Sequence, residues 1–254
     1  MITDISFYFL AVPVVFLVGR STGGFGGGLG TLAVPLLALM IDPRFAAAIL
    51  LPILCSMDAF SLWNFRDTWD KRNLKILLPG ALLGTVAGAL TFEITNADWI
   101  RVVIGVLSIY FVGHYLWGRR FLEELRERKP DKIAGTFWGC IAGYVSYIAH
   151  AGGPPVAIYL LPQHLTKSVL AGTTILFFAI INFIKLVPYV WLGQITSGSL
   201  FTSLALLPLA PLGVWFGVYL HRRVSDRIFY WISYGFLLIA GFKLMYEGTL
   251  GLLG

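Results

Sequence analysis

The stretch His150-Ala151-Gly152-Gly153-Pro154-Pro155 interrupts an apolar segment that runs from Ile133 to Pro162. That segment is too long for a single crossing helix, which needs roughly 20 residues. Paired glycines allow the backbone to turn, and prolines suit the first turn of a new helix, where a missing N–H costs little. We therefore predict two short helices joined at a bend within this segment, and the same for the equivalent segment near the start of the chain.

An equivalent interruption lies near the start of the chain, where Gly23-Gly24-Phe25-Gly26-Gly27-Gly28 divides an apolar segment from Ile5 to Met40. Helix ends inside a membrane are tolerated only against protein or a water-filled cavity. The free N–H groups and positive dipole of a helix N-terminus favour an anion. The matched breaks predict one anion site built from both halves, with plain glycine packing as the alternative.

The composition excludes a water-soluble globular protein. Of the 254 residues, 57% are hydrophobic and 13% are charged, and the mean hydropathy is +0.80. We predict an all-α polytopic membrane protein in which residues 1–254 form a single membrane domain. Six further segments are predicted as full spans: Ala46 to Phe65, Leu74 to Phe92, Trp99 to Trp117, Val169 to Trp191, Leu200 to Leu220 and Ile228 to Leu250.

Three clusters of Lys and Arg set the expected orientation, because positive residues in short loops stay cytoplasmic. If each interrupted segment enters and returns on the same side, all three clusters become cytoplasmic and both termini lie on the outer side. Orientation then explains the net charge of +6, so no nucleic-acid partner is expected. The clusters span Arg66 to Lys75, Arg119 to Lys132 and Arg222 to Arg227.

The two halves of the chain resemble each other. Gly84-xxx-Gly88 recurs as Gly213-xxx-Gly217, and Arg44 to Phe65 aligns without gaps with Ser168 to Tyr189. A hairpin plus three spans crosses the bilayer an odd number of times, so the second unit must run in the opposite direction. The predicted fold is two inverted-topology repeats, each a glycine-broken helical hairpin plus three transmembrane helices. The first repeat is 1–118, the cytoplasmic linker 119–132 and the second repeat 133–254.

Asp58 and Lys185 are ionisable residues well inside predicted spans, where a charge is costly and usually functional. In the ungapped alignment Asp58 falls opposite Asn182, and Ser61 falls opposite Lys185. We hypothesise that Asn182 and Lys185 bind the substrate anion. Asp58 either pairs with Lys185 when the site is empty or carries a proton, and a purely structural ion pair stays open.

The bends supply the remaining site candidates. His150 precedes the second bend, where it either contacts the anion or serves as a hydrogen-bonded packing residue. Arg20, Ser21 and Thr22 border the first bend, and they either reach the site or face water. The backbone candidates for substrate binding are Gly26, Gly27, Gly28, Gly152 and Gly153.

Catalytic, metal and cofactor sites are not expected. Cys55 and Cys140 lie in apolar segments without a CxxC or His-rich context, so we expect them to be small core residues. The sequence has no GxSxG and no HExxH, and an intramembrane enzyme is poorly supported because Asp58 is the one carboxylate well inside a span.

Three stretches together resemble the sulfite exporter TauE/SafE family, which is also grouped with toluene-sulfonate uptake permeases. They are GGFGGGLGTLAVPLL (23–37), AHAGGPPVAIYLLP (149–162) and FFAIINFIKLVPYVWLGQ (177–194). The resemblance implies a bacterial inner-membrane transporter that moves sulfite, sulfoacetate or another organosulfonate, often outward. Arg20 matches no residue of the general family pattern.

The expected partners are a small anionic substrate and the lipid bilayer, and a homo-oligomer stays open. Two other functions also remain. An anion channel would share the hairpins and the basic site, and a membrane scaffold would use the same helices without transport.

Overall fold

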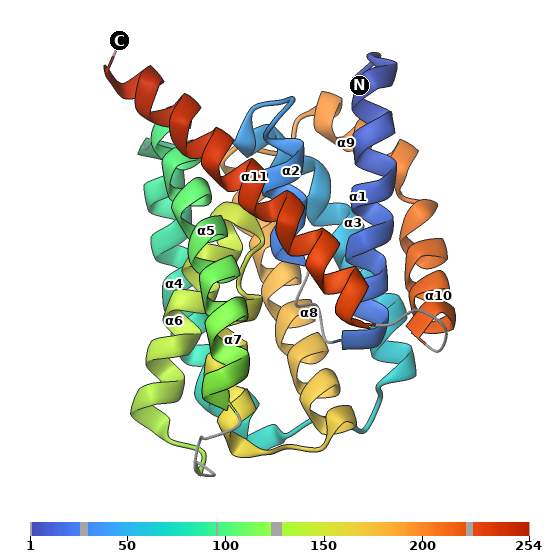
Figure 1. The fold of residues 1–254 in the computed structure, drawn as a ribbon, viewed down its shortest axis with the longest axis vertical. Coiled ribbons are helices and arrows are strands. Elements are labelled where there is room, and N and C mark those ends of the chain that lie inside the picture. Colours follow the sequence, from blue (N-terminus) through green and yellow to red (C-terminus); the bar gives the residue numbers. More distant parts are fainter. Residues whose placement is uncertain (1, 26–29, 95, 123–128, 222–225, 254) are drawn as a thin grey trace.

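The computed structural model describes residues 2–25, 30–94, 96–122, 129–221 and 226–253 (Figure 1). This part of the chain is helical and contains no strand. The helices are α1 (Ile5–Phe25), η1 (Gly30–Leu32), α2 (Ala33–Leu37), α3 (Pro43–Asn64), α4 (Lys71–Ile94), α5 (Ala97–Leu122), α6 (Lys132–Ala149), α7 (Gly153–Leu160), η2 (Leu161–Gln163), α8 (Lys167–Trp191), α9 (Ser197–Leu206), α10 (Leu209–His221) and α11 (Asp226–Leu253).

Four stretches of the described residues are long and apolar enough to cross a membrane: Pro43–Asn64, Lys71–Phe92, Ser168–Trp191 and Ser197–Trp215. Together with the apolar composition, they make the chain a polytopic membrane protein. One expected span differs from the structure. Leu200 to Leu220 is divided into α9 and α10 at Pro208, because proline lacks the N–H that would continue the helical hydrogen bonds.

Both interrupted segments contain the predicted change of helix, but their arms are unequal. In the first, α1 has 21 residues and the return arm α2 has five. In the second, α6 has 18 residues and α7 has eight. The expectation of two short helices is therefore wrong for the first arm of each segment, which is long. The reason is that apolar, helix-forming residues continue up to each bend.

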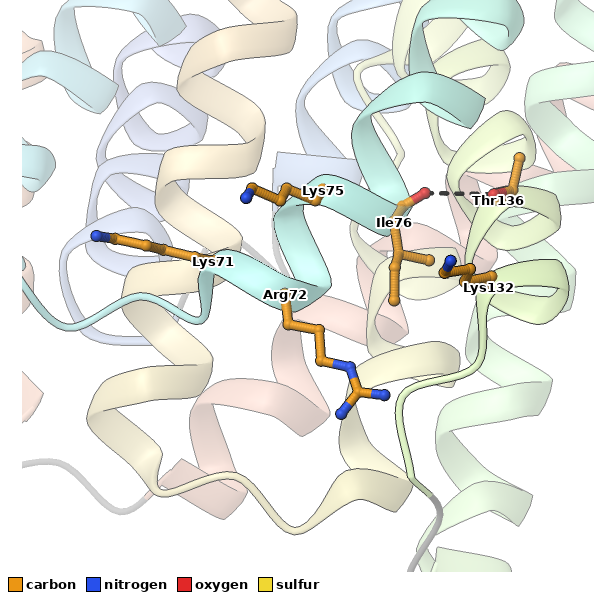
Figure 2. Close-up of a pocket in the computed structure, with 6 residues that line it drawn as sticks. All are labelled: Lys71, Arg72, Lys75, Ile76, Lys132 and Thr136. Atoms are coloured by element: carbon orange, nitrogen blue, oxygen red, sulfur yellow. Dashed lines mark hydrogen bonds between the residues drawn. The ribbon is translucent and has the colours of Figure 1, made fainter.

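The helix ends divide the molecule into two faces. The beginning of α1 and the end of α11 both lie at the top of Figure 1, on opposite sides, whereas the connections from α3 to α4 and from α7 to α8 lie at the bottom. A cavity of about 630 Å³ opens between the first turns of α4 and α6. Figure 2 shows its lining residues: Lys71, Arg72, Lys75, Ile76, Lys132 and Thr136.

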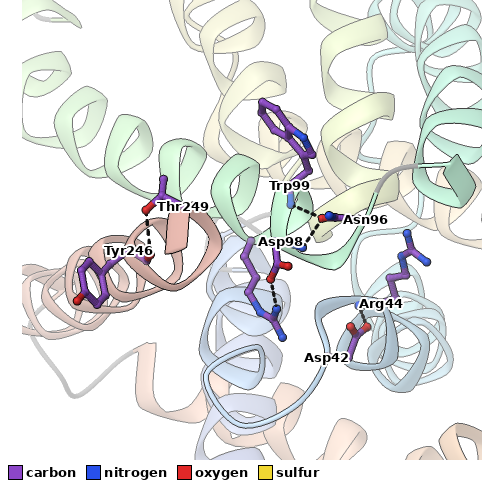
Figure 3. A network of polar contacts seen from close by, with 8 residues as sticks. Asp42, Arg44, Asn96, Asp98, Trp99, Tyr246 and Thr249 are labelled. Carbon is purple, nitrogen blue, oxygen red and sulfur yellow. Dashed lines mark hydrogen bonds and ion pairs between the residues drawn. The ribbon is translucent and has the colours of Figure 1, made fainter. Parts of the chain in front are cut away.

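At the face that carries the termini, the polar contacts shown in Figure 3 mainly cap helices. Asn96 accepts from the backbone N–H groups of Asp98 and Trp99 at 2.8 and 2.9 Å. Arg101 forms a 2.6 Å ion pair with Asp98. The cavity lined by Lys71, Arg72, Lys75 and Lys132 lies at the face opposite to these capping contacts.

Long-range packing joins helices from opposite halves of the chain. Helix α4 packs along α6, α1 along α10, and α5 along α11, while α3 contacts α8 in the interior. Small residues allow this closeness, as expected between helices in lipid. A Cβ on Gly84 would overlap the backbone carbonyl of Cys140, and a Cβ on Gly19 would lie 2.9 Å from the backbone of Gly213.

Candidate functional site

The ammonium group of Lys185 lies at the bend between α6 and α7. Lys185 itself belongs to α8 and is fully buried. Its Nζ lies 2.9 Å from the backbone oxygen of Ser146 and 3.0 Å from the Ser146 hydroxyl. Carbonyls in the last turn of a helix carry partial negative charge, and each has a second lone pair that can accept from a side chain. Lys185 therefore donates to the C-terminal end of α6.

His150 supplies the third neighbour of Lys185, with its Nδ1 2.9 Å from the Lys185 Nζ. Its backbone is left-handed (φ 49°), which ends α6, and its N–H donates to the Ser146 carbonyl at 3.1 Å. The other ring nitrogen, Nε2, lies 2.9 Å from the carbonyl oxygen of Ala47. Because a carbonyl only accepts, we assign the proton to Nε2, and Nδ1 then faces Lys185 as an acceptor.

A second polar pair joins α3 and α8 in the interior. The Asn182 Nδ2 donates to the Asp58 Oδ2 at 2.6 Å, and both side chains are buried. Asp58 follows the first residue of α3 by 15 positions, and Asn182 follows the first residue of α8 by the same number. Both are thus about 22 Å along helices that begin at opposite faces, which places the pair in the middle of the molecule.

The two ionisable residues that the sequence singled out have different partners in this structure. Asp58 pairs with Asn182, whereas Lys185 contacts Ser146 and His150. Within the described ranges, ion pairs join Arg101 to Asp98 and Lys243 to Glu247, and neither involves Asp58 or Lys185. Lys185 and Asn182 stand three positions apart on α8, so the two pairs occupy successive turns of the helix.

The glycines of the second bend lie beside this cluster. Helix α7 begins at Gly153, with prolines in its first turn as expected, and Gly152 is its N-cap. A Cβ on Gly152 would lie 2.7 Å from the Ala142 carbonyl and 2.9 Å from the Phe178 ring. Gly152 is therefore required here for close packing of the bend against α6 and α8.

The site candidates of the first bend belong to the end of α1 and to the glycines that follow it. Thr22 is buried, and its hydroxyl donates to the Val18 carbonyl at 2.9 Å within α1. Arg20 and Ser21 belong to the C-terminal half of the same helix. Gly26, Gly27 and Gly28 lie outside the described residues. The equivalent of Lys185 in the alignment, Ser61, is buried, and its hydroxyl has no hydrogen-bond partner in the described part of the chain.

Sequence reasoning missed Ser146, which provides two of the three contacts to Lys185. The alignment of the two halves contained a signal for Ser146. The offset of 124 positions that relates Asp58 to Asn182 also relates Thr22, which was a site candidate, to Ser146. Both residues lie near the end of the first arm of a hairpin.

An aromatic layer was also missed. Tyr147, Tyr189 and Phe92 are each at most 1% exposed. The rings of Tyr147 and Tyr189 are 4.9 Å apart, the rings of Phe92 and Tyr147 are 5.7 Å apart, and the Tyr189 hydroxyl donates to the Tyr147 carbonyl at 2.8 Å. Tyr189 follows Lys185 by one helical turn, toward Gln194 in the loop after α8, and the Tyr147 hydroxyl donates to the Gln194 side chain at 3.3 Å. The layer therefore separates Lys185 from that loop.

Comparison with known proteins identifies the family. The model of the sulfite exporter TauE/SafE family matches residues 11–244, a range that includes both bends, the Lys185 cluster and the Asp58 to Asn182 pair. Searches among curated proteins and among solved structures gave no match. Because the family model covers nearly the whole chain, this multi-pass membrane protein belongs to the TauE/SafE sulfite exporter family of transporters.

Proposed function

We propose that the chain exports a small anion, such as sulfite, sulfoacetate or another organosulfonate, by alternating access around a site at Lys185. The observation that carries the proposal is the set of neighbours around the Lys185 ammonium. They are a backbone carbonyl, a serine hydroxyl and a histidine acceptor nitrogen, all uncharged. In the described part of the chain this buried cation has no carboxylate among its hydrogen-bond partners, a position that an anionic substrate would fill.

Substrate binding requires an exchange of partners at the Lys185 ammonium. An oxygen of the anion replaces one of the neutral acceptors and receives a charge-assisted hydrogen bond, which is stronger than a bond to a neutral group. Asn182, one turn away on α8, adds an amide donor if it releases Asp58. His150, Gly152 and Gly153 complete the proposed site at the bend, and the first bend with Gly26, Gly27 and Gly28 contributes from the other half.

The inverted-repeat architecture belongs to the same proposal, with repeats at 1–118 and 133–254. Two observations support it. The starts of α3 and α8, Pro43 and Lys167, differ by the same 124 positions as the Asp58 to Asn182 pair. Each long hairpin arm also packs on a helix of the other half, α6 on α4 and α1 on α10, and Gly84, Gly88 and Gly213 lie in these contacts. Rocking of one repeat against the other would expose the site to each side in turn.

The aromatic layer supports a state that is closed toward one face. Tyr147, Tyr189 and Phe92 cover Lys185 on the side of the Gln194 loop, which is the face that carries the termini. We propose that this face is the outer one, because the basic cluster from Arg66 to Lys75 belongs to the opposite face. For a bacterial inner membrane with a negative interior, the potential favours anion export by about 2.3 kcal/mol per charge per 100 mV.

Sulfite efflux from proteoliposomes that contain the purified chain tests the proposal. Export by a carrier predicts a rate that saturates with sulfite concentration. A rate that rises without saturation supports a channel, and efflux no faster than from empty liposomes supports a scaffold. A thermal-shift screen against sulfite, sulfoacetate, taurine, thiosulfate, sulfate and small carboxylates then ranks the substrates. Native mass spectrometry of the same sample tests whether the chain forms a homo-oligomer.

A further inference from the structure

The basic cavity between α4 and α6 is not needed for the proposed transport site. It has a volume of about 630 Å³ and lies at the first turns of the two helices, at the far end of α6 from Lys185. Four of its lining residues are cations: Lys71, Arg72, Lys75 and Lys132. We infer that this cavity binds the phosphate headgroup of an anionic phospholipid of the inner leaflet.

The charge of the cavity is uncompensated within the described part of the chain. None of the four cations takes part in the ion pairs found there. The two acids that flank them in sequence act as helix caps: Asp70 accepts the Arg72 N–H at 2.7 Å, and Asp131 accepts the Ala134 N–H at 2.7 Å. A phosphate diester would therefore meet donors that are not engaged by any carboxylate of the described residues.

The shape of the cavity fits a headgroup between helix ends. Figure 2 shows Arg72 and Lys132 on either side of Ile76, whose carbonyl accepts from the Thr136 hydroxyl at 3.4 Å and joins α4 to α6. Lys71 and Lys75 extend from the same first turns of α4. Basic pockets between transmembrane helices on the cytoplasmic side are the sites that anionic headgroups occupy.

Apolar surface for acyl chains continues directly from the cations. On α4, Leu82, Val86 and Leu90 follow Lys75 by seven, eleven and fifteen positions and thus lie on its face of the helix, with exposed fractions of 41%, 58% and 67%. On α6, Ile133 and Phe137 are 84% and 58% exposed beside Lys132. A soluble anion would gain nothing from this surface, whereas a phospholipid would contact both its charged and its apolar parts.

The inference can be tested by native mass spectrometry of the delipidated full-length chain, titrated separately with phosphatidylglycerol and with phosphatidylethanolamine of the same acyl chains. The expected result is a clear preference for phosphatidylglycerol. The double variant Arg72→Gln/Lys132→Gln should weaken phosphatidylglycerol binding by about thirtyfold. The matched control is Arg66→Gln/Lys129→Gln, which removes the same charge from exposed residues outside the cavity lining and should bind normally.

Three results would overturn the inference. One is equal binding of the two lipids, and another is an equal loss of binding in the control variant, since either would show that the cavity does not select a headgroup. The third is displacement of phosphatidylglycerol by millimolar inorganic phosphate, which would assign the cavity to a soluble anion. Size-exclusion chromatography verifies that both double variants are folded. Since Lys185 is unchanged in each, failure here leaves the proposed transport site untouched.

Discussion

Replacement of Lys185 by methionine is the most direct test of the transport site. Methionine retains much of the side-chain length and removes the ammonium group that contacts Ser146 and His150. Truncating one partner of a buried, hydrogen-bonded charge pair costs about 2–5 kcal/mol. If sulfite binds as the partner of this ammonium, its affinity should fall at least about thirtyfold.

The effect on stability separates this role from a structural one. Loss of the ammonium leaves the His150 Nδ1 without its donor, at a cost of about 1–3 kcal/mol for an unsatisfied buried acceptor. It also removes the desolvation penalty of a buried charge, which acts in the opposite direction. The net change in folding free energy should therefore be smaller than the loss in substrate binding free energy.

The assay measures saturable sulfite efflux and sulfite-induced thermal stabilisation for the same variants. Lys185→Gln is the second variant, because its amide can still donate to the Ser146 carbonyl while carrying no charge. Lys243→Met is the control, since Lys243 is half exposed and pairs with Glu247 at 3.6 Å. Folded Lys185→Met and Lys185→Gln proteins with normal sulfite affinity and efflux would refute the assignment.

Other parts of the structure give three further predictions. Gly84→Ala should destabilise the protein by about 1–3 kcal/mol, because the added Cβ would overlap the α6 backbone. The control Gly113→Ala should not destabilise it, because no described atom lies within 4 Å of that Cβ. Equal melting temperatures of the two variants would contradict the prediction. Tyr189→Phe removes the donor to a buried carbonyl in the aromatic layer and should lower the melting temperature by the equivalent of about 1–3 kcal/mol, and no shift would mean that the bond contributes little. Asp58→Asn should fold, since an amide oxygen still accepts from Asn182, and efflux should lose its dependence on a pH gradient if Asp58 carries a proton; an unchanged dependence assigns the pair a structural role.

Several features of the fold follow from local sequence. Gly152 and Gly153 followed by two prolines predicted the start of α7, because backbone freedom and the missing proline N–H act within a few residues. The ungapped alignment placed Asp58 opposite Asn182, and these residues are hydrogen-bonded in the structure. Pro208 was visible in the sequence, but the apolar pattern continues across it, so the division between α9 and α10 was missed.

The partners of the site residues could not be predicted in the same way. An ion pair between Lys185 and Asp58 was one of the two roles considered for Asp58, yet the Lys185 ammonium contacts the end of α6, which is 39 positions away in sequence. Ser146 carries no distinctive local pattern, and Tyr147 and Tyr189 resemble the many other aromatic residues of the spans. Their roles depend on which helix ends meet, which is a property of packing.

The sequence by itself determined that the chain is helical, crosses a membrane and changes helix within two glycine-rich segments, because hydrophobicity and helix breaking act locally along the chain. The tertiary structure decided which side chains meet at the second bend. There a lysine on α8 contacts the last turn of α6, and a histidine with left-handed backbone bonds the carbonyl of Ala47 on α3. Such contacts depend on the packing of three helices distant in sequence, and no local pattern specifies how those helices approach one another.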